Sequence, residues 1–149
     1  MKILKIKTLE KGWVDQDNVM LHANFQILTN FVEQEDPFEV IDWNSNKTHK
    51  EVAKEIRSLY RWWTKSRPNR HDPFDDLKEN EIPSWKEHSK PVYADDGKTV
   101  KHNLFIGSPP NYPKYNAVCK KMHKLDLKWE AEDQENLLRL IKIRRFLWT

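Results

Sequence analysis

The stretch THKEVAKEIRSLYRWWTKSRP, Thr48–Pro68, decides the fold that we predict for this chain. Its large apolar residues recur at the +4, +3 and +4 spacing of one face of an α-helix, and they are Val52, Ile56, Leu59 and Trp63. Thr48 and Glu51 have the spacing of a capping box, which predicts the first turn of this helix. Pro68 lacks the N–H that a helix interior needs, so we expect the helix to end near Ser66.

A basic stripe lies almost opposite this apolar face and consists of Lys50, Lys54, Arg57, Arg61 and Lys65. Trp63 continues the apolar stripe, whereas Trp62 points off it toward the basic side and is expected to be exposed. An indole beside arginines suits a flat anionic ligand, because the ring can stack on a base while a guanidinium binds a phosphate.

The sequence therefore predicts a phosphate- and base-binding site formed by Arg57, Arg61, Trp62, Lys65, Arg67, Arg70 and His71. On this interpretation, replacing Arg67 and Arg70 by alanine abolishes binding with little loss of stability. Two alternatives stay open. Either Trp62 covers the proline-rich segment that follows while the arginines pair with carboxylates, or these residues form a patch for a partner protein.

Upstream, the apolar residues between Val19 and Val32 sweep an arc of roughly 200° on a helix over about 15–34, which favours contact on two sides. Asn24 falls inside this arc, and a buried amide needs a hydrogen-bond partner within the chain, in a ligand or in a second subunit. Residues 2–9 half-alternate between apolar and polar, which indicates a short strand.

Downstream, residues 73–113 hold most of the prolines, and a long irregular excursion between helices is often functional. Within it, PVYADDGKTV (91–100) predicts a β-hairpin, with Asp96 and Gly97 in the turn. Pro113 can open a last helical region, either as two segments separated by EAEDQEN (130–136) or as one continuous helix. Candidate residues for an interface with a partner or a second subunit are Asn24, Trp85, Phe105 and Trp148.

These elements predict a mainly α fold with three to four helices packed as an irregular bundle and a small β-hairpin in the proline-rich excursion. We expect one domain over residues 1–149, with a helical core formed by about 15–66 and 113–148 and the excursion over about 67–112.

The composition indicates which classes of protein the chain can belong to. The chain has 149 residues with seven tryptophans, a net charge of +3 and a mean hydropathy of -0.90, which indicates a globular chain with a charged surface. The single cysteine, Cys119, excludes an internal disulfide and a four-cysteine zinc site. The N-terminal residues lack an uninterrupted apolar run, and no stretch has the length of a membrane span, so we expect a cytoplasmic protein that does not bind membranes.

Sequence motifs of catalysis are missing. The chain has no H-E-x-x-H, P-loop, G-x-S-x-G or dinucleotide-binding motif. His71-Asp72 has the order of the metal dyad of HD-type phosphohydrolases, but that dyad lies within a helix, whereas this pair lies between Pro68 and Pro73. We expect no metal and no cofactor, and binding is favoured over catalysis.

Three stretches together resemble a known group of proteins: MLHANFQILTNFVE (20–33), WWTKSRPNRHDPFDD (62–76) and LLRLIKIRRFLWT (137–149). The chain resembles small, tryptophan-rich proteins of tailed bacteriophages that are generally classed as hypothetical. The resemblance implies a phage gene expressed in the cytoplasm of the bacterial host and transfers no catalytic residue. Small phage accessory proteins often counter host defence, some of them by sequestering nucleotide-derived immune signals.

The function expected first is therefore an anti-defence sponge that binds a nucleotide-type small molecule and forms a homo-oligomer, because subunit boundaries readily enclose pockets. The alternative is a protein-interaction module that inhibits or redirects a host or phage enzyme. Nonspecific nucleic-acid binding is third, since the basic stripes permit phosphate contact but the net charge is modest.

Overall fold

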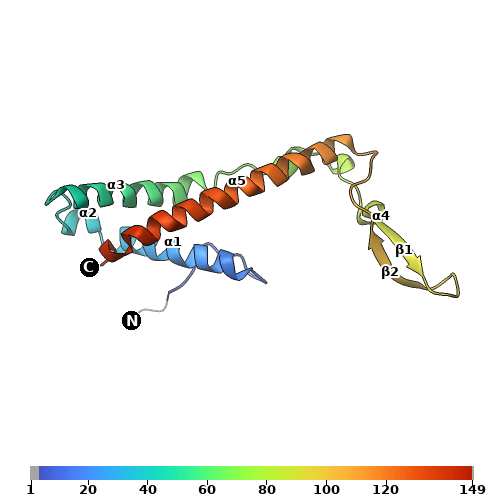
Figure 1. Ribbon diagram of the computed structural model, residues 1–149, viewed down its shortest axis with the longest axis horizontal. Coiled ribbons are helices and arrows are strands. Elements are labelled where there is room, and N and C mark those ends of the chain that lie inside the picture. The colour runs from blue at the N-terminus through green and yellow to red at the C-terminus, as the bar shows by residue number, and fades with distance from the viewer. Residues whose placement is uncertain (1–3, 149) are drawn as a thin grey trace. The chain divides into compact units, whose positions relative to one another are not determined.

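A computed structural model describes residues 4–148 and shows a chain that is 61% helical, with one antiparallel hairpin (Figure 1). Its helices are α1 (Gln16–Gln34), α2 (Pro37–Val40), α3 (Lys47–Arg61), α4 (Trp85–His88) and α5 (Pro113–Ile143), and its strands are β1 (Ser89–Tyr93) and β2 (Val100–Phe105). The predicted mainly α class with a small hairpin is confirmed. The helix count exceeds the prediction because α2 and α4 are single turns of four residues.

Contacts divide the described residues into two compact units. Unit 1 comprises the residues up to Arg70 and those from Trp129 onward, and unit 2 comprises residues 71–128. Residues 113–128, which the predicted helical core includes, belong to unit 2, whereas residues 67–70 of the predicted excursion belong to unit 1. Each unit is described separately below.

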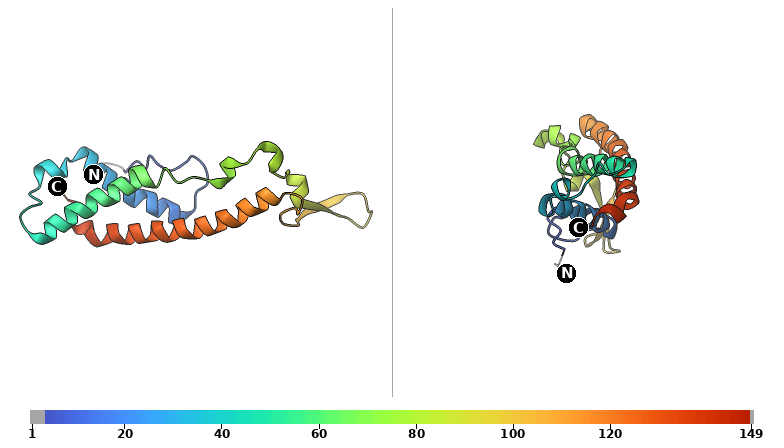
Figure 2. Two further views of the ribbon diagram at one scale, coloured as in Figure 1. Left: turned by 90° about the horizontal axis from the view of Figure 1, so that it is seen from above. Right: turned by 90° about the vertical axis from the view of Figure 1, so that its left-hand side faces the viewer.

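Unit 1 is built on three helical segments, α1, α3 and the part of α5 from Trp129 onward, which lie side by side in Figures 1 and 2. Their apolar faces meet in a core that includes Phe25, Leu28, Ile56, Leu59 and Leu140. The rings of Phe25 and Trp63 stack with their centres 4.6 Å apart. The α3 stripe predicted from Val52 to Trp63 is buried in this core.

Helix α3 begins one residue before the predicted capping box. Asn46 is its N-cap, and the Asn46 side chain accepts a hydrogen bond from the backbone N–H of His49 at 2.9 Å. The prediction that Thr48 caps the helix is therefore wrong. An asparagine two residues upstream satisfies the first-turn donor, and asparagine is among the strongest N-cap residues.

The end of α3 departs from regular α-helix. Residues Trp62–Ser66 form a turn of π-helix, in which the N–H of Arg67 donates to the carbonyl oxygen of Trp62 at 2.8 Å. This bond spans five residues, so the turn is wider than an α-helical turn. The helical conformation ends just before Pro68, as predicted from the missing N–H.

Helix α1 covers the predicted range but is not enclosed on two sides. Leu21, Phe25 and Leu28 are buried, whereas Met20 and Ile27 are exposed. The Asn24 amide donates to the carbonyl oxygen of Met20 at 2.7 Å, so this amide has a partner within the chain, which is one of the expected possibilities. Of the strand predicted over residues 2–9, residues 2 and 3 lie outside the described residues, and residues 4–9 form no strand. Instead, the N–H of Lys7 donates to the buried side chain of Gln26 at 2.9 Å.

Helix α5 is one continuous helix, which decides between the two predicted arrangements of its region. The EAEDQEN stretch does not break the helix, because glutamate, alanine and glutamine are good helix formers. Within unit 1, Glu132 and Asp133 of this stretch accept hydrogen bonds from side chains at the end of α3 and just beyond it.

Unit 2 contains α4, the hairpin and the part of α5 up to Lys128. The Tyr115 ring packs against Phe74 and His88, with centres 5.7 and 5.6 Å apart. The hairpin turn follows the prediction, since Gly97 has a φ of 63° and Asp96 accepts hydrogen bonds from the residues that follow it. Among residues 4–148, no helix has both the length and the apolar character needed to cross a membrane.

Candidate functional site

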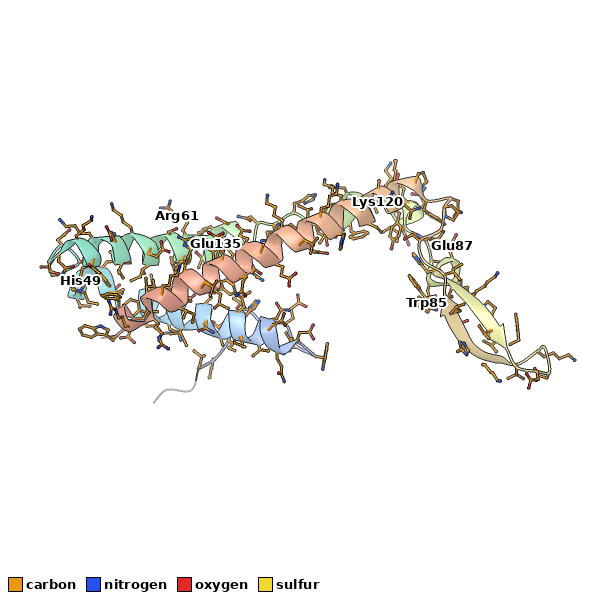
Figure 3. All side chains as sticks on the ribbon, viewed as in Figure 1. His49, Arg61, Trp85, Glu87, Lys120 and Glu135 are labelled. Atoms are coloured by element: carbon orange, nitrogen blue, oxygen red, sulfur yellow. The ribbon has the colours of Figure 1, made fainter. Side chains whose placement is uncertain are left out.

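A groove between α3 and α5 in unit 1 contains part of the predicted site. It has a volume of about 600 Å³. Its α3 side and the π-helical turn contribute Lys54, Arg57, Ser58, Arg61, Trp62 and Ser66, and α5 contributes Glu132, Glu135, Asn136 and Arg139. Figure 3 shows the labelled Arg61 and Glu135 on these two helices.

Three cations from α3 line one wall of the groove. Lys54, Arg57 and Arg61 follow each other at i, i+3 and i+7, which places them on one helix face. Among the described residues none of the three has an ion pair, although the Arg57 guanidinium lies 4.0 Å from the centre of the Phe38 ring. All three are exposed, so they are available to an anion.

The opposite wall carries groups of both signs. Arg139 is held by Glu55, with Nε to Oε1 at 2.6 Å and Nη2 to Oε2 at 2.9 Å, and this hydrogen bonding is the main reason why the pKa of Glu55 is lowered. Arg139 also donates to the Asn136 amide oxygen at 2.6 Å. Its donors are therefore largely used within the protein, whereas Glu135 has no ion pair among the described residues.

Trp62 is one of the residues that line the groove. Its side chain is buried, with only 8% of the residue exposed, so the predicted exposure of this indole is wrong. The indole Nε1 donates to Glu132 at 3.0 Å, and the ring packs against Phe25 with centres 5.2 Å apart. A tryptophan buried in this way has no open face on which a base could stack.

Arg67 and Arg70 follow the alternative in which the arginines pair with carboxylates. Arg67 donates to Asp133 from Nε at 3.2 Å and from Nη2 at 2.9 Å. Arg70 Nη2 donates to Asp133 at 2.6 Å and to Glu132 at 2.7 Å. Both guanidinium groups thus hold the end of α3 against α5 and lie outside the lining of the groove.

The remaining two predicted residues are not brought to the groove. Lys65 is exposed on the π-helical turn and does not line it. His71 belongs to unit 2, where its ring lies 3.0 Å from both carboxylate oxygens of Asp76. This hydrogen bond raises the pKa of His71. Of the seven predicted residues, Arg57, Arg61 and Trp62 line the groove, Lys65, Arg67 and Arg70 do not line it, and His71 belongs to unit 2.

Three of the four predicted interface residues are exposed. Trp148 in unit 1 and Trp85 and Phe105 in unit 2 each expose about two thirds of their surface, and Figure 3 labels Trp85 at the start of α4. Asn24 is half-buried beside the exposed Met20. Their role in an interface stays a prediction.

A metal site or a reactive cysteine or histidine has little support in the described residues. Within residues 4–148, no group of three or more histidine, cysteine or acidic side chains is arranged to hold a metal ion. Cys119 is half-buried on α5 in unit 2. His22 has a lowered pKa because it is partly buried and lies near Arg67, and its ring lies against Trp63.

The site prediction missed seven of the lining residues: Lys54, Ser58, Ser66, Glu132, Glu135, Asn136 and Arg139. Only Lys54 had a signal in the sequence, because it belongs to the same basic stripe as Arg57. The others line the groove because α5 packs against α3, with Arg139 lying 84 residues from its partner Glu55. No family model, curated protein or solved structure matches the chain, so the groove is interpreted from its own geometry.

Proposed function

We propose that the chain acts by binding a small anionic molecule of the nucleotide type in the groove between α3 and α5. The observation that supports this proposal best is the row formed by Lys54, Arg57 and Arg61, which have no ion pair within residues 4–148 and line a groove of about 600 Å³. Binding sites for small molecules commonly have volumes in this range.

The two walls of the groove favour a ligand with both charge and hydrogen-bonding groups. The guanidinium groups of Arg57 and Arg61 suit phosphate oxygens, because arginine donates two parallel hydrogen bonds to such groups. Glu135 offers a free acceptor for an amino or hydroxyl group of the ligand, and it disfavours a bare polyanion that fills the whole groove. A nucleotide has phosphate at one end and such donors at the other.

Sequestration is proposed in preference to turnover. The lining has two serine hydroxyls, Ser58 and Ser66, but no histidine that could act as their general base. In the phage context implied by the resemblance, the bound molecule would be a nucleotide-derived signal of host defence. That context rests on the resemblance alone.

The test is native mass spectrometry of the protein purified from bacterial cells, followed by calorimetric titration with ATP and with a cyclic dinucleotide. We expect an adduct of defined mass, or saturable binding of one of these probes. The variant Arg57→Ala/Arg61→Ala should lose at least about tenfold in affinity, because each guanidinium–phosphate contact contributes on the order of 1–3 kcal/mol. Lys65→Ala is the matched control, since Lys65 is an exposed cation of the same segment that lies outside the groove.

Equal loss of binding in both variants would indicate a nonspecific charge effect. An absence of any adduct together with no heat from either probe would contradict the proposal.

A second candidate function is a protein-interaction module that inhibits or redirects another enzyme. The specific observation in its favour is the exposure of Trp85 and Phe105 in unit 2, because large aromatic side chains are enriched at interface hot spots. Trp85→Ala/Phe105→Ala should release a stoichiometric partner that copurifies with the wild-type protein. Retention of that partner by the double variant would exclude this surface.

A further inference from the structure

The two outer edges of the hairpin differ. The N–H of Ile106 donates to the carbonyl oxygen of His88 at 2.9 Å, which makes these two residues a hydrogen-bonded pair. In an antiparallel ladder such pairs alternate with pairs that are not hydrogen-bonded. Ser89 and Pro91 on β1, and their partners Phe105 and Asn103 on β2, are therefore the residues whose backbone groups point away from the hairpin.

Pro91 blocks the outer edge of β1. Proline has no N–H, and it lies here at a position where that N–H would face outward. A proline on an edge strand prevents another strand from pairing there. The outer edge of β2 has no such block, because Asn103 and Phe105 both keep an outward N–H and an outward carbonyl group.

A two-stranded hairpin on its own is only marginally stable in water, and three or more strands are usually required. Among the described residues the sheet has just these two strands, and Figure 1 shows no further strand along either edge. Leu104, Phe105 and Ile106 are each more than half exposed. The hairpin thus combines an open edge with apolar side chains that lack a covering layer.

We propose that β2 pairs antiparallel with β2 of a second copy of this chain, around a two-fold axis at Leu104. The result is a four-stranded sheet in the order β1, β2, β2 of the second copy, β1 of the second copy. Both outer edges of that sheet carry Pro91, so the assembly stops at two chains and does not continue as a fibre.

The register follows from the irregularities that flank residues 102–106. Lys101 is the extra residue of a β-bulge, and Gly107 has a φ of 84°, so regular pairing is confined between them. A two-fold axis at Leu104 lies at the centre of residues 102–106, so both copies contribute the same regular segment. Asn103 then exchanges backbone hydrogen bonds with Phe105 of the second copy, and Leu104 lies opposite Leu104 of the second copy.

In this register no two residues of like charge lie opposite each other across the two β2 strands. Lys101 comes to lie opposite Gly107 of the second copy, and His102 opposite Ile106 of the second copy. An axis at Asn103 would bring the bulged Lys101 into the paired region, and an axis at Phe105 would require Gly107 to be extended. Leu104 is the centre that makes both strands regular.

The first experiment measures the oligomeric state by sedimentation velocity across a concentration series. We expect wild type and Asn103→Ala to dimerise and Asn103→Pro to be monomeric. The proline removes only the outward N–H, because Asn103 lies in a pair that is not hydrogen-bonded within the hairpin. A wild-type protein that stays monomeric throughout the series, or an Asn103→Pro variant that still dimerises, would overturn the proposal.

The second experiment tests the register in a Cys119→Ser background, which removes the only native thiol. Leu104→Cys should form a disulfide-linked dimer on mild oxidation, because opposed residues of a pair that is not hydrogen-bonded have Cα atoms about 4.5 Å apart. His102→Cys is the control on the same face of the strand. Its two copies would be four residues apart along the strands, or about 14 Å at 3.4 Å per residue, and should not cross-link.

Equal cross-linking of the two cysteine variants, or none at Leu104→Cys, would contradict this pairing even if the protein is dimeric. The ligand-binding proposal is unaffected by either result, because it is measured by the adduct or by heat and not by the oligomeric state.

Discussion

Arg70 is the side chain on which most contacts at the end of α3 converge. Its guanidinium carbon lies 5.8 Å from the centre of the Trp62 ring and 5.5 Å from that of Trp129, and its Nη2 bonds to two carboxylates. Such a position satisfies the charge of the arginine while its flat surface packs on aromatic rings. The role of Arg70 in this arrangement is to join α3 to α5.

We predict that Arg70→Ala lowers the free energy of unfolding by about 2–3 kcal/mol, because it removes two charge-assisted hydrogen bonds in a partly buried place. Asp133 then keeps only Arg67, and Glu132 keeps only the Trp62 indole. Urea denaturation followed by circular dichroism measures this change. The result differs from the expectation drawn from the sequence, in which loss of Arg67 and Arg70 has little effect on stability. Lys65→Ala serves as the control and should change stability by less than about 0.5 kcal/mol. An Arg70→Ala variant as stable as wild type would show that these ion pairs contribute nothing.

Asp96 gives a prediction for pH. Hydrogen bonds from the side chain and backbone of Thr99 and from the backbone of Lys98 lower the pKa of Asp96 from 3.8 to about 2. Because the folded turn binds this proton less readily than the unfolded chain does, the stabilisation is complete above pH 3.8 and is lost as the pH falls toward 2. Carboxyl carbon NMR should give a pKa near this value in wild type.

The matched variant is Thr99→Val, which keeps the size and β-branching of the side chain and removes its hydroxyl. The pKa of Asp96 should then move back toward 3.8, because the largest contribution to its shift comes from that hydroxyl. An unchanged titration curve in Thr99→Val would assign the shift to the backbone donors alone.

At the scale of elements, packing against two helices explains why the exposure predicted for Trp62 is wrong. The Trp62 ring packs against Phe25 of α1, and its indole Nε1 donates to Glu132 of α5. A residue beside the apolar stripe of α3 is therefore buried together with Trp63. The apolar spacing of α3 does not signal the approach of α5, because α5 lies far away in the sequence.

The start of α3 provides a prediction for an element. Asn46→Ala should lower the free energy of unfolding by about 1 kcal/mol, because its side chain caps the helix through the N–H of His49. Thr48→Ala, at the residue that the sequence pattern favours as the cap, should have an effect below about 0.5 kcal/mol. Thermal unfolding of the two variants compares them directly. A larger loss of stability in Thr48→Ala than in Asn46→Ala would instead support Thr48 as the N-cap.

At the scale of the whole molecule, the local elements were predictable and the long-range partners were not. The helices over Gln16–Gln34 and Lys47–Arg61 and the hairpin turn at Gly97 follow from periodicity, proline and glycine, which act over a few residues. The partners of Arg67 and Arg70 lie about sixty residues away in sequence, on α5. A run of carboxylates such as EAEDQEN offers many equivalent partners, so the sequence does not indicate which arginine each one receives.

The division of unit 1 into two stretches of chain has a consequence for its synthesis. Leu140 and Ile143 belong to the same core as Phe25 and Ile56, but all of residues 71–128 are translated between them. At about 5–20 residues per second, the nascent chain waits several seconds between the release of α3 and the arrival of the last turns of α5. Throughout that interval the apolar faces of α1 and α3 lack the residues of α5 that complete their core, so we expect unit 1 to reach its native packing only after residues 71–128 have been translated.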